Sequence, residues 1–148
     1  MGPPKVEPIG LHLARTAKAV SRAFDAALAE AGGSLPVWLI LVSLKAEAHS
    51  AQRQLAEAVG IEGPTLTHHL NKMETAGLVT RRRDPGNRRV HRVGLTDAGD
   101  AMFAALVRHV AAFDARLREG FSDRDLAQLR RLLDRLTINV GDPAPEEG

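Results

Sequence analysis

The chain has 148 residues, enough for one compact domain with its own hydrophobic core. Hydrophobic residues make up 44% and charged residues 26%, as in ordinary globular proteins, so disorder over the whole length is not expected. The lack of cysteine excludes disulfides, thiol redox switches, cysteine nucleophiles and thiolate zinc sites. Aromatic residues make up only 3%, which disfavours binding of single strands by base stacking.

No membrane segment is expected, because no apolar run approaches the ~20 residues that a transmembrane helix needs. Residues Met1–Lys5 lack the apolar core of a secretory signal. With the absence of cysteine, these features favour a cytoplasmic protein without a membrane partner.

Positive charge is concentrated between Thr65 and Leu95, although the net charge of the chain is only +2. This segment holds seven basic and two acidic residues, so its net charge is +5, and the remainder of the chain sums to −3. Such a segment favours a polyanionic partner, with nucleic acid as the first candidate. A solvated arginine-rich loop is the alternative that charge alone leaves open.

Two helices are predicted in the first third of the chain. Residues 1–8 are expected to form a flexible N-terminus. An apolar stripe at helical spacing then predicts a helix of roughly 20 residues that ends at Gly32-Gly33. The stripe consists of Leu13, Ala17, Val20, Phe24 and Leu28. Ser34 before Leu35-Pro36 is a helix start signal. The apolar run Val37–Leu44 favours a buried helix, although its β-branched residues leave a strand open.

Two short helices follow, with a glycine between them. The first spans Gln52–Val59 and the second Pro64–Ala76, and Gly77 is a natural end for the second. The apolar positions are Leu55, Ala56 and Val59 in the first helix, and Leu66, Leu70 and Met73 in the second. Gly60 permits the positive φ of a tight turn. This spacing is typical of a helix-turn-helix, whose second helix enters the DNA major groove.

The pattern changes to that of strands over residues 78–95. The β-prone segments Leu78–Thr80 and Val90–Leu95 flank Asp84-Pro85-Gly86-Asn87, a strong turn sequence. We therefore predict a β-hairpin with an arginine-rich tip. A helix-turn-helix followed by such a hairpin is a winged helix.

Two further helices are predicted in the C-terminal part. Thr96-Asp97 begins the first, and Ser122–Asp125 resembles a capping box that begins the second. Their apolar residues are spaced alternately three and four apart: Phe103, Leu106, Val110, Phe113 and Leu117, then Leu126, Leu129, Leu133, Leu136 and Val140. These apolar faces are larger than the helix-turn-helix and the hairpin need to cover their own core. This favours pairing with a second chain over the alternative of an intramolecular bundle. Residues 141–148 are predicted to be a flexible tail.

From Leu11 to Val140 the sequence resembles the MarR family of transcriptional regulators. The resemblance is carried by Leu35–Trp38, Leu55–Ile61, Met73–Val79, Arg83–Arg89 and Leu95–Gly99. It implies a mainly α (α+β) fold and a homodimer. The winged helix would span 35–95, between dimerisation helices at 9–34 and 96–140. One departure is Asn87, where the family usually has an Asp that braces the wing arginine Arg89.

The resemblance also implies the residues that contact double-stranded DNA. The second short helix offers Thr65, Thr67, His68, Asn71 and Lys72. Asparagine is able to read adenine bidentately, and we expect His68 to face DNA while His69 lies at the flank. In the wing, Arg88 and Arg89 are candidates for the minor groove, and Arg81, Arg82 and Arg83 are expected, with Lys72, to meet phosphates.

Release of DNA by a small aromatic or phenolic ligand is a further implication. By position, the candidate ligand residues are His12, Arg15, Trp38 and His49. Arg15 would pair with a carboxylate or phenolate, whereas Trp38 would either stack on the ligand or fill the core. No metal or other cofactor is expected, since no two of the six histidines stand at i, i+4.

The predicted function is that of a sequence-specific transcriptional regulator, a homodimeric repressor released from a pseudo-palindromic operator by its ligand. No catalytic motif is present, so an enzyme is not expected. The alternative is a winged helix that binds DNA without sequence preference, or that binds proteins, and has no ligand.

Overall fold

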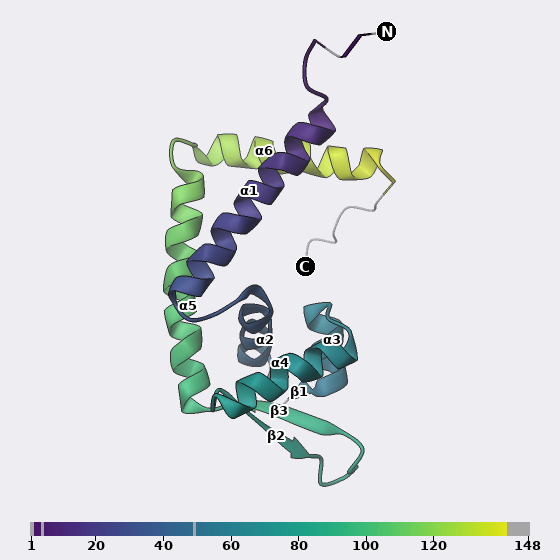
Figure 1. Cartoon of the computed structure of the whole chain (residues 1–148), viewed down its shortest axis with the longest axis vertical. Coiled ribbons are helices and arrows are strands. Elements are labelled where there is room, and N and C mark those ends of the chain that lie inside the picture. Colours follow the sequence, from purple (N-terminus) through teal and green to yellow (C-terminus); the bar gives the residue numbers. More distant parts are fainter. Residues whose placement is uncertain (1, 4, 49, 142–148) are drawn as a thin grey trace. The chain divides into compact units, whose positions relative to one another are not determined.

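The computed structural model describes residues 2–3, 5–48 and 50–141 (Figure 1). The chain divides into two compact units, Met1–Ala111 and Ala112–Gly148. The division falls inside helix α5 (Asp97–Arg118). The first unit therefore holds four helices, a small sheet and the first part of α5, and the second holds the rest of α5 and helix α6 (Asp123–Asn139).

Helices α1 (Ile9–Glu30) and α2 (Leu35–Ala46) occupy the positions predicted for the first two helices. Gly32 ends α1 with a φ of 80°, and the N–H of Gly33 donates to the carbonyl of Leu28 at 2.9 Å. Ser34 then caps α2, because its Oγ accepts from the N–H of Val37 at 3.4 Å. The helical interpretation of Val37–Leu44 is confirmed, and the strand alternative is wrong.

Helices α3 (Gln52–Val59) and α4 (Gly63–Thr75) form the helix-turn-helix. Gly60 lies between them with a φ of 73°, as the turn requires. At the end of α4, Gly77 has a φ of 76°, and the N–H of Leu78 donates to the carbonyl of Met73 at 2.9 Å. This Schellman motif ends α4 and directs the chain into the next strand.

The sheet has three antiparallel strands in the order β1-β3-β2: β1 (Ser50–Ala51), β2 (Val79–Arg83) and β3 (His91–Leu95). The predicted hairpin corresponds to β2 and β3, but the prediction of two strands was incomplete. In β1, Ser50 pairs with Val93 and Ala51 with Arg92. This strand ties the beginning of α3 to the wing.

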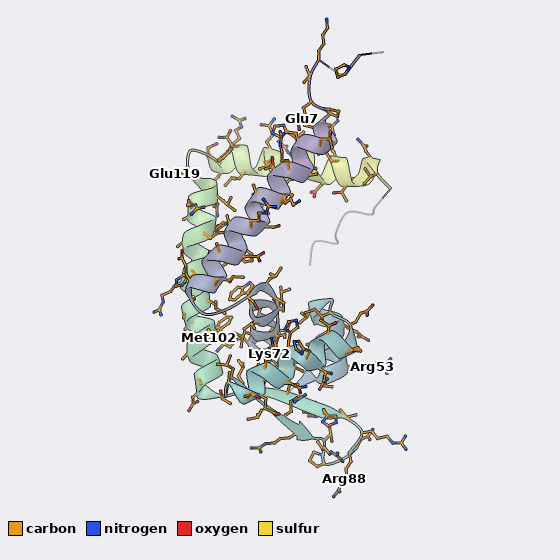
Figure 2. All side chains as sticks on the ribbon, in the orientation of Figure 1. Glu7, Arg53, Lys72, Arg88, Met102 and Glu119 are labelled. Carbon is orange, nitrogen blue, oxygen red and sulfur yellow. The ribbon has the colours of Figure 1, made fainter. Side chains whose placement is uncertain are left out.

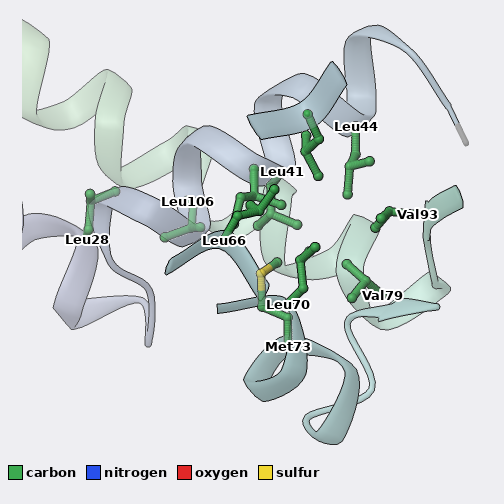
Figure 3. Packing of buried hydrophobic residues seen from close by; sticks show 11 residues of the cluster. Leu28, Leu41, Leu44, Leu66, Leu70, Met73, Val79, Val93 and Leu106 are labelled. Atoms are coloured by element: carbon green, nitrogen blue, oxygen red, sulfur yellow. The ribbon is translucent and has the colours of Figure 1, made fainter. Parts of the chain in front are cut away.

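The core of the first unit is built mainly from leucines (Figure 3). Its buried members come from α1, α2, α3, α4, the sheet and α5: Leu28, Ile40, Leu41, Leu44, Leu55, Leu66, Leu70, Met73, Val79, Val93 and Leu106. At its edge, Trp38 stacks on Phe103 with ring centroids 5.7 Å apart. No single helix in the described ranges is long and apolar enough to cross a membrane, and α1 with α2 meets that test only as a pair bent by 71°.

The second unit has the capping box that its sequence predicts. Ser122 Oγ accepts from the N–H of Asp125 at 3.1 Å, and the Asp125 carboxylate accepts from the N–H of Ser122 at 3.0 Å. None of the residues of α6 is buried, and Leu129, Leu132 and Leu133 are exposed.

Candidate nucleic-acid interface

Helix α4 presents a polar face to solvent. Burial of Leu66, Leu70 and Met73 fixes the rotation of the helix about its axis. The exposed residues away from this buried side include Pro64, Thr65, His68, Asn71, Lys72, Glu74 and Thr75. His68 is exposed and His69 is partly buried, so the two adjacent rings lie on different faces, as their spacing predicts. This exposed face is the surface through which α4 would contact a groove.

Thr67 is placed differently from the other predicted recognition residues. It is only partly exposed, and its Oγ1 donates to the carbonyl of Gly63 at 2.9 Å. The same oxygen accepts from Gln52 Nε2 at 2.8 Å. The hydroxyl therefore ties the start of α3 to α4, and its hydrogen is already used within the protein.

Arg81 of β2 joins the wing to α4. Its Nη2 donates to Asn71 Oδ1 and to Glu74 Oε1, the latter at 3.1 Å, and its Nε lies 3.5 Å from Glu74 Oε2. Only 18% of the Arg81 side chain is exposed. The hydrogen bond from Arg81 lowers the pKa of Glu74 below its ordinary value of 4.5. Arg81 was predicted as a phosphate contact, and in this structure its charge already faces a carboxylate.

Asp84 organises the tip of the wing. Its Oδ1 accepts from the N–H of Gly86 at 2.7 Å, and its Oδ2 accepts from Arg92 Nε at 2.7 Å. The hydrogen bond from Arg92, followed by that from the Gly86 backbone, lowers the pKa of Asp84 below 3.8. Asn87 Oδ1 accepts from the backbone N–H of Arg89 at 3.2 Å. The residue that departs from the family pattern is thus an acceptor that shapes the turn.

The pairing of acidic residues determines which positive charges the wing displays. Glu74 and Asp84 are the two acidic residues of the basic segment, and both pair with arginines of that segment. The other wing arginines are exposed: Arg82, Arg83, Arg88 and Arg89. Figure 2 shows Arg88 projecting from the loop between β2 and β3. These four guanidinium groups form the basic surface of the wing.

The predicted ligand residues occupy unlike surroundings. His12 and Arg15 are exposed on α1, and Arg15 pairs with Glu7. Trp38 packs on Phe103, and Lys45 lies over the same ring, 5.4 Å from its centroid. His49 lies outside the described residues.

The first unit contains a groove of about 880 Å³ that is lined by other residues. They belong to α3, the beginning of α4 and the segment where the hairpin loop enters β3, and include Arg53, Arg89 and His91. Within the described ranges, no group of three His, Cys, Asp or Glu residues is placed to hold a metal.

Comparison with known proteins identifies the winged helix. Residues 34–91 match the model of the MarR family. The chain contains a MarR-family domain. The MarR family comprises non-enzymatic DNA-binding transcriptional regulators, and residues 34–91 of this chain resemble their DNA-binding domain. The predicted fold, a winged helix-turn-helix with further helices before and after it in the sequence, is confirmed.

Solved MarR-family structures extend the similarity beyond the winged helix. The transcriptional repressor CouR, bound to a 23-mer DNA duplex, is 28% identical with a TM-score of 0.77, over 88% of this chain and 92% of that one. CouR from Rhodococcus jostii RHA1 bound to p-coumaroyl-CoA gives 26% identity and a TM-score of 0.71, over 90% and 95% of the two chains. The PcaV regulator from Streptomyces coelicolor is 22% identical with a TM-score of 0.77, over 87% and 97%, and shares the fold.

Proposed function

We propose that the chain is a cytoplasmic, homodimeric repressor that binds a pseudo-palindromic operator sequence-specifically and is released by a small aromatic or phenolic ligand. The observation that carries the proposal is the display of charge on the winged helix. Both acidic residues of the basic segment are paired internally, so four wing arginines and the polar face of α4 are presented together within one unit. The DNA-bound structure of CouR supports this use of the surface.

In this proposal the two parts of the surface contact different grooves. Helix α4 enters the major groove, where Thr65, His68 and Asn71 meet base edges. Lys72, Arg82 and Arg83 meet phosphates, and Arg88 and Arg89 reach the minor groove, whose negative potential is strongest where it is narrow. Thr67 and Arg81 serve mainly to hold the surface in shape, because their polar atoms already bond α3 and α4.

Uncovered apolar surface supports a homodimer. On α6, Leu129, Leu132 and Leu133 are exposed, and on α1 the same is true of Ile9 and Leu11. Apolar surface of this kind is rarely left open on a monomer. A two-fold dimer would present two α4 helices to half-sites separated by about 34–36 Å, one turn of DNA.

Ligand release is supported by the CouR structure that contains p-coumaroyl-CoA. A ligand acts here only by binding more tightly to a state in which the two α4 helices no longer match two grooves. Arg15 would have to exchange Glu7 for an anionic ligand, and His12 lies on the same helix. Trp38 would contact the ligand at the edge of the stack that it forms with Phe103.

The proposal is tested by selecting bound duplexes from a randomised library with the purified protein and sequencing them. The expected motif consists of two inverted half-sites about one helical turn apart. Uniform recovery of all sequences would contradict the proposal and favour a DNA-architectural protein instead, whose binding depends on salt but not on sequence.

A further inference from the structure

We infer that Gln52 is a positioning residue for DNA recognition: its hydrogen bond to Thr67 holds the first half of α4 against the sheet of the wing, and discrimination between DNA sequences depends on this bond. The inference rests on the proposed function, in which α4 reads base edges in the major groove. It goes beyond that function by giving a residue of α3 a part in base recognition that is exerted through α4.

The hydrogen bond between Gln52 and Thr67 has a fixed direction. The Thr67 hydroxyl has a single hydrogen, which is donated to the carbonyl of Gly63 at 2.9 Å. Toward Gln52 the Thr67 oxygen is therefore an acceptor, and Gln52 Nε2 lies 2.8 Å from it. Only the amide NH2 suits this position, because the amide oxygen would set two acceptors against each other. The side chain of Gln52 is thus held in one orientation.

Gln52 is itself fixed to the sheet. It is the first residue of α3 and directly follows β1, in which Ala51 pairs with Arg92 of β3. Helix α3 has no side-chain cap at its start, and the pairing of β1 with β3 fixes the backbone there instead. The side chain of Gln52 is partly buried. Its bond to Thr67 therefore connects the sheet of the wing to the second turn of α4.

Polar side chains tie α4 to the sheet at two places. Toward the end of the helix, Arg81 of β2 donates to two residues of α4. In the first half of the helix, the tie is the bond from Gln52 to Thr67. Thr65 and His68, two of the residues proposed to meet base edges, lie in this first half. Loss of the Gln52 bond would free this end of α4 while Arg81 still holds the other.

Base recognition is sensitive to small displacements of α4. A binding constellation has to be held within about 0.5 Å and 10–20° of its productive geometry. Leu55 and Leu66 pack in the core that α3 and α4 share, but apolar packing is not directional. A hydrogen bond is directional and places one atom of α4 relative to the sheet. Its loss should therefore reduce discrimination between sequences, whereas phosphate contacts, which carry no sequence information, keep their strength.

The experiment measures a specificity ratio: the affinity for a duplex recovered in the library selection divided by the affinity for a scrambled duplex. Gln52→Met removes the hydrogen-bond donor and keeps an unbranched side chain. We expect the ratio to fall by roughly three- to tenfold, the range that one hydrogen bond contributes. The affinity for the scrambled duplex and its dependence on salt should stay the same. A purely structural role would lower the free energy of unfolding in urea and leave the ratio of the folded protein unchanged.

Matched variants isolate the bond. Thr67→Val removes the hydroxyl and nearly keeps the shape, so it should lower the ratio as much as Gln52→Met, whereas Thr67→Ser keeps the hydroxyl and should retain the ratio. Gln54→Met makes the same substitution two residues further along α3, where the side chain is exposed, and should also retain it. Gln52→Met combined with Thr67→Val should lower the ratio no further than either alone, because both remove one bond.

The outcomes separate this inference from the proposed function. An unchanged ratio in Gln52→Met, or effects that add in the double variant, would overturn the inference and leave sequence-specific binding intact. Equal losses of affinity for both duplexes would overturn it too and indicate that Gln52 contacts the DNA backbone. If Gln52→Met fails to fold, equal ratios in Thr67→Val and Thr67→Ser would overturn it. Uniform recovery of sequences by the unmodified protein would overturn the proposed function and this inference with it.

Discussion

Gly99, in the first turn of α5, packs so closely on the carbonyl of Leu78 that a Cβ at position 99 would overlap the carbonyl oxygen. The same carbonyl accepts from the N–H of Thr96 at 3.1 Å. Thr96 Oγ1 in turn donates to the carbonyl of Gly77 and accepts from the N–H of Gly99 at 3.0 Å. This junction joins the end of α4, the start of the wing and the start of α5.

We therefore expect Gly99→Ala to destabilise the protein by about 1–3 kcal/mol, the usual cost of overpacking. Urea denaturation measures the effect. Gly10→Ala in α1 is the control, because nothing lies within 4 Å of a Cβ there. Its free energy of unfolding should stay the same or rise slightly. Equal effects of the two substitutions would show that the Leu78 contact is not as tight as described.

Joint replacement of Arg88 and Arg89 by Ala should weaken DNA binding without changing the oligomeric state of the protein. Each lost phosphate or groove contact reduces the dependence of binding on salt, so the slope should fall by about two. Arg130→Ala with Arg131→Ala, on α6, removes the same charge outside the winged helix. Unchanged affinity in the wing variant would remove these arginines from the interface.

Arg92→Met should raise the pKa of Asp84 toward 3.8, because the Arg92 hydrogen bond is the main reason that this pKa is low. A lowered carboxylate pKa contributes stability at neutral pH that is lost as pH falls through the lowered value. The variant should thus have less of this contribution at neutral pH, and its free energy of unfolding should fall less than that of the unmodified protein as pH drops below 3.8. A carbon-13 NMR titration of the Asp84 carboxyl follows the change. A pKa that does not move would refute the pairing.

Leu129→Asp with Leu133→Asp should convert the proposed dimer into a monomer, since both side chains are exposed on α6. Light scattering after size-exclusion chromatography reports the mass. Operator affinity should fall by roughly a hundredfold or more, because the two half-sites are no longer bound by one molecule. Arg131→Asp is the control on the same helix. A variant that retains the dimer mass and the affinity of the unmodified protein would show that these two leucines do not hold the dimer together.

Much of the fold is readable from local chemistry. Helices follow from apolar residues at helical spacing, and their ends follow from Ser34, Thr96 and Ser122 as N-caps and from glycines with positive φ. Strand β1 was missed because two residues carry no periodic signal. Its pairing with β3 depends on a contact far along the chain.

The candidate site was predictable only in part. Helical spacing alone separates exposed His68 from partly buried His69. The roles of Gln52 and Glu74 were missed, because their partners Thr67 and Arg81 lie on other elements. Opposite charges at positions 74 and 81 are a hint, but only the course of the chain after Gly77 brings Glu74 and Arg81 together.

The most direct measurement of the central claim is fluorescence anisotropy of the purified protein on a duplex enriched by selection and on a scrambled duplex, at two salt concentrations. Sequence-specific regulation predicts saturable binding at least ~1,000-fold tighter to the enriched duplex, with the difference persisting as salt rises. Equal affinities for the two duplexes, weakening together as salt rises, would contradict it.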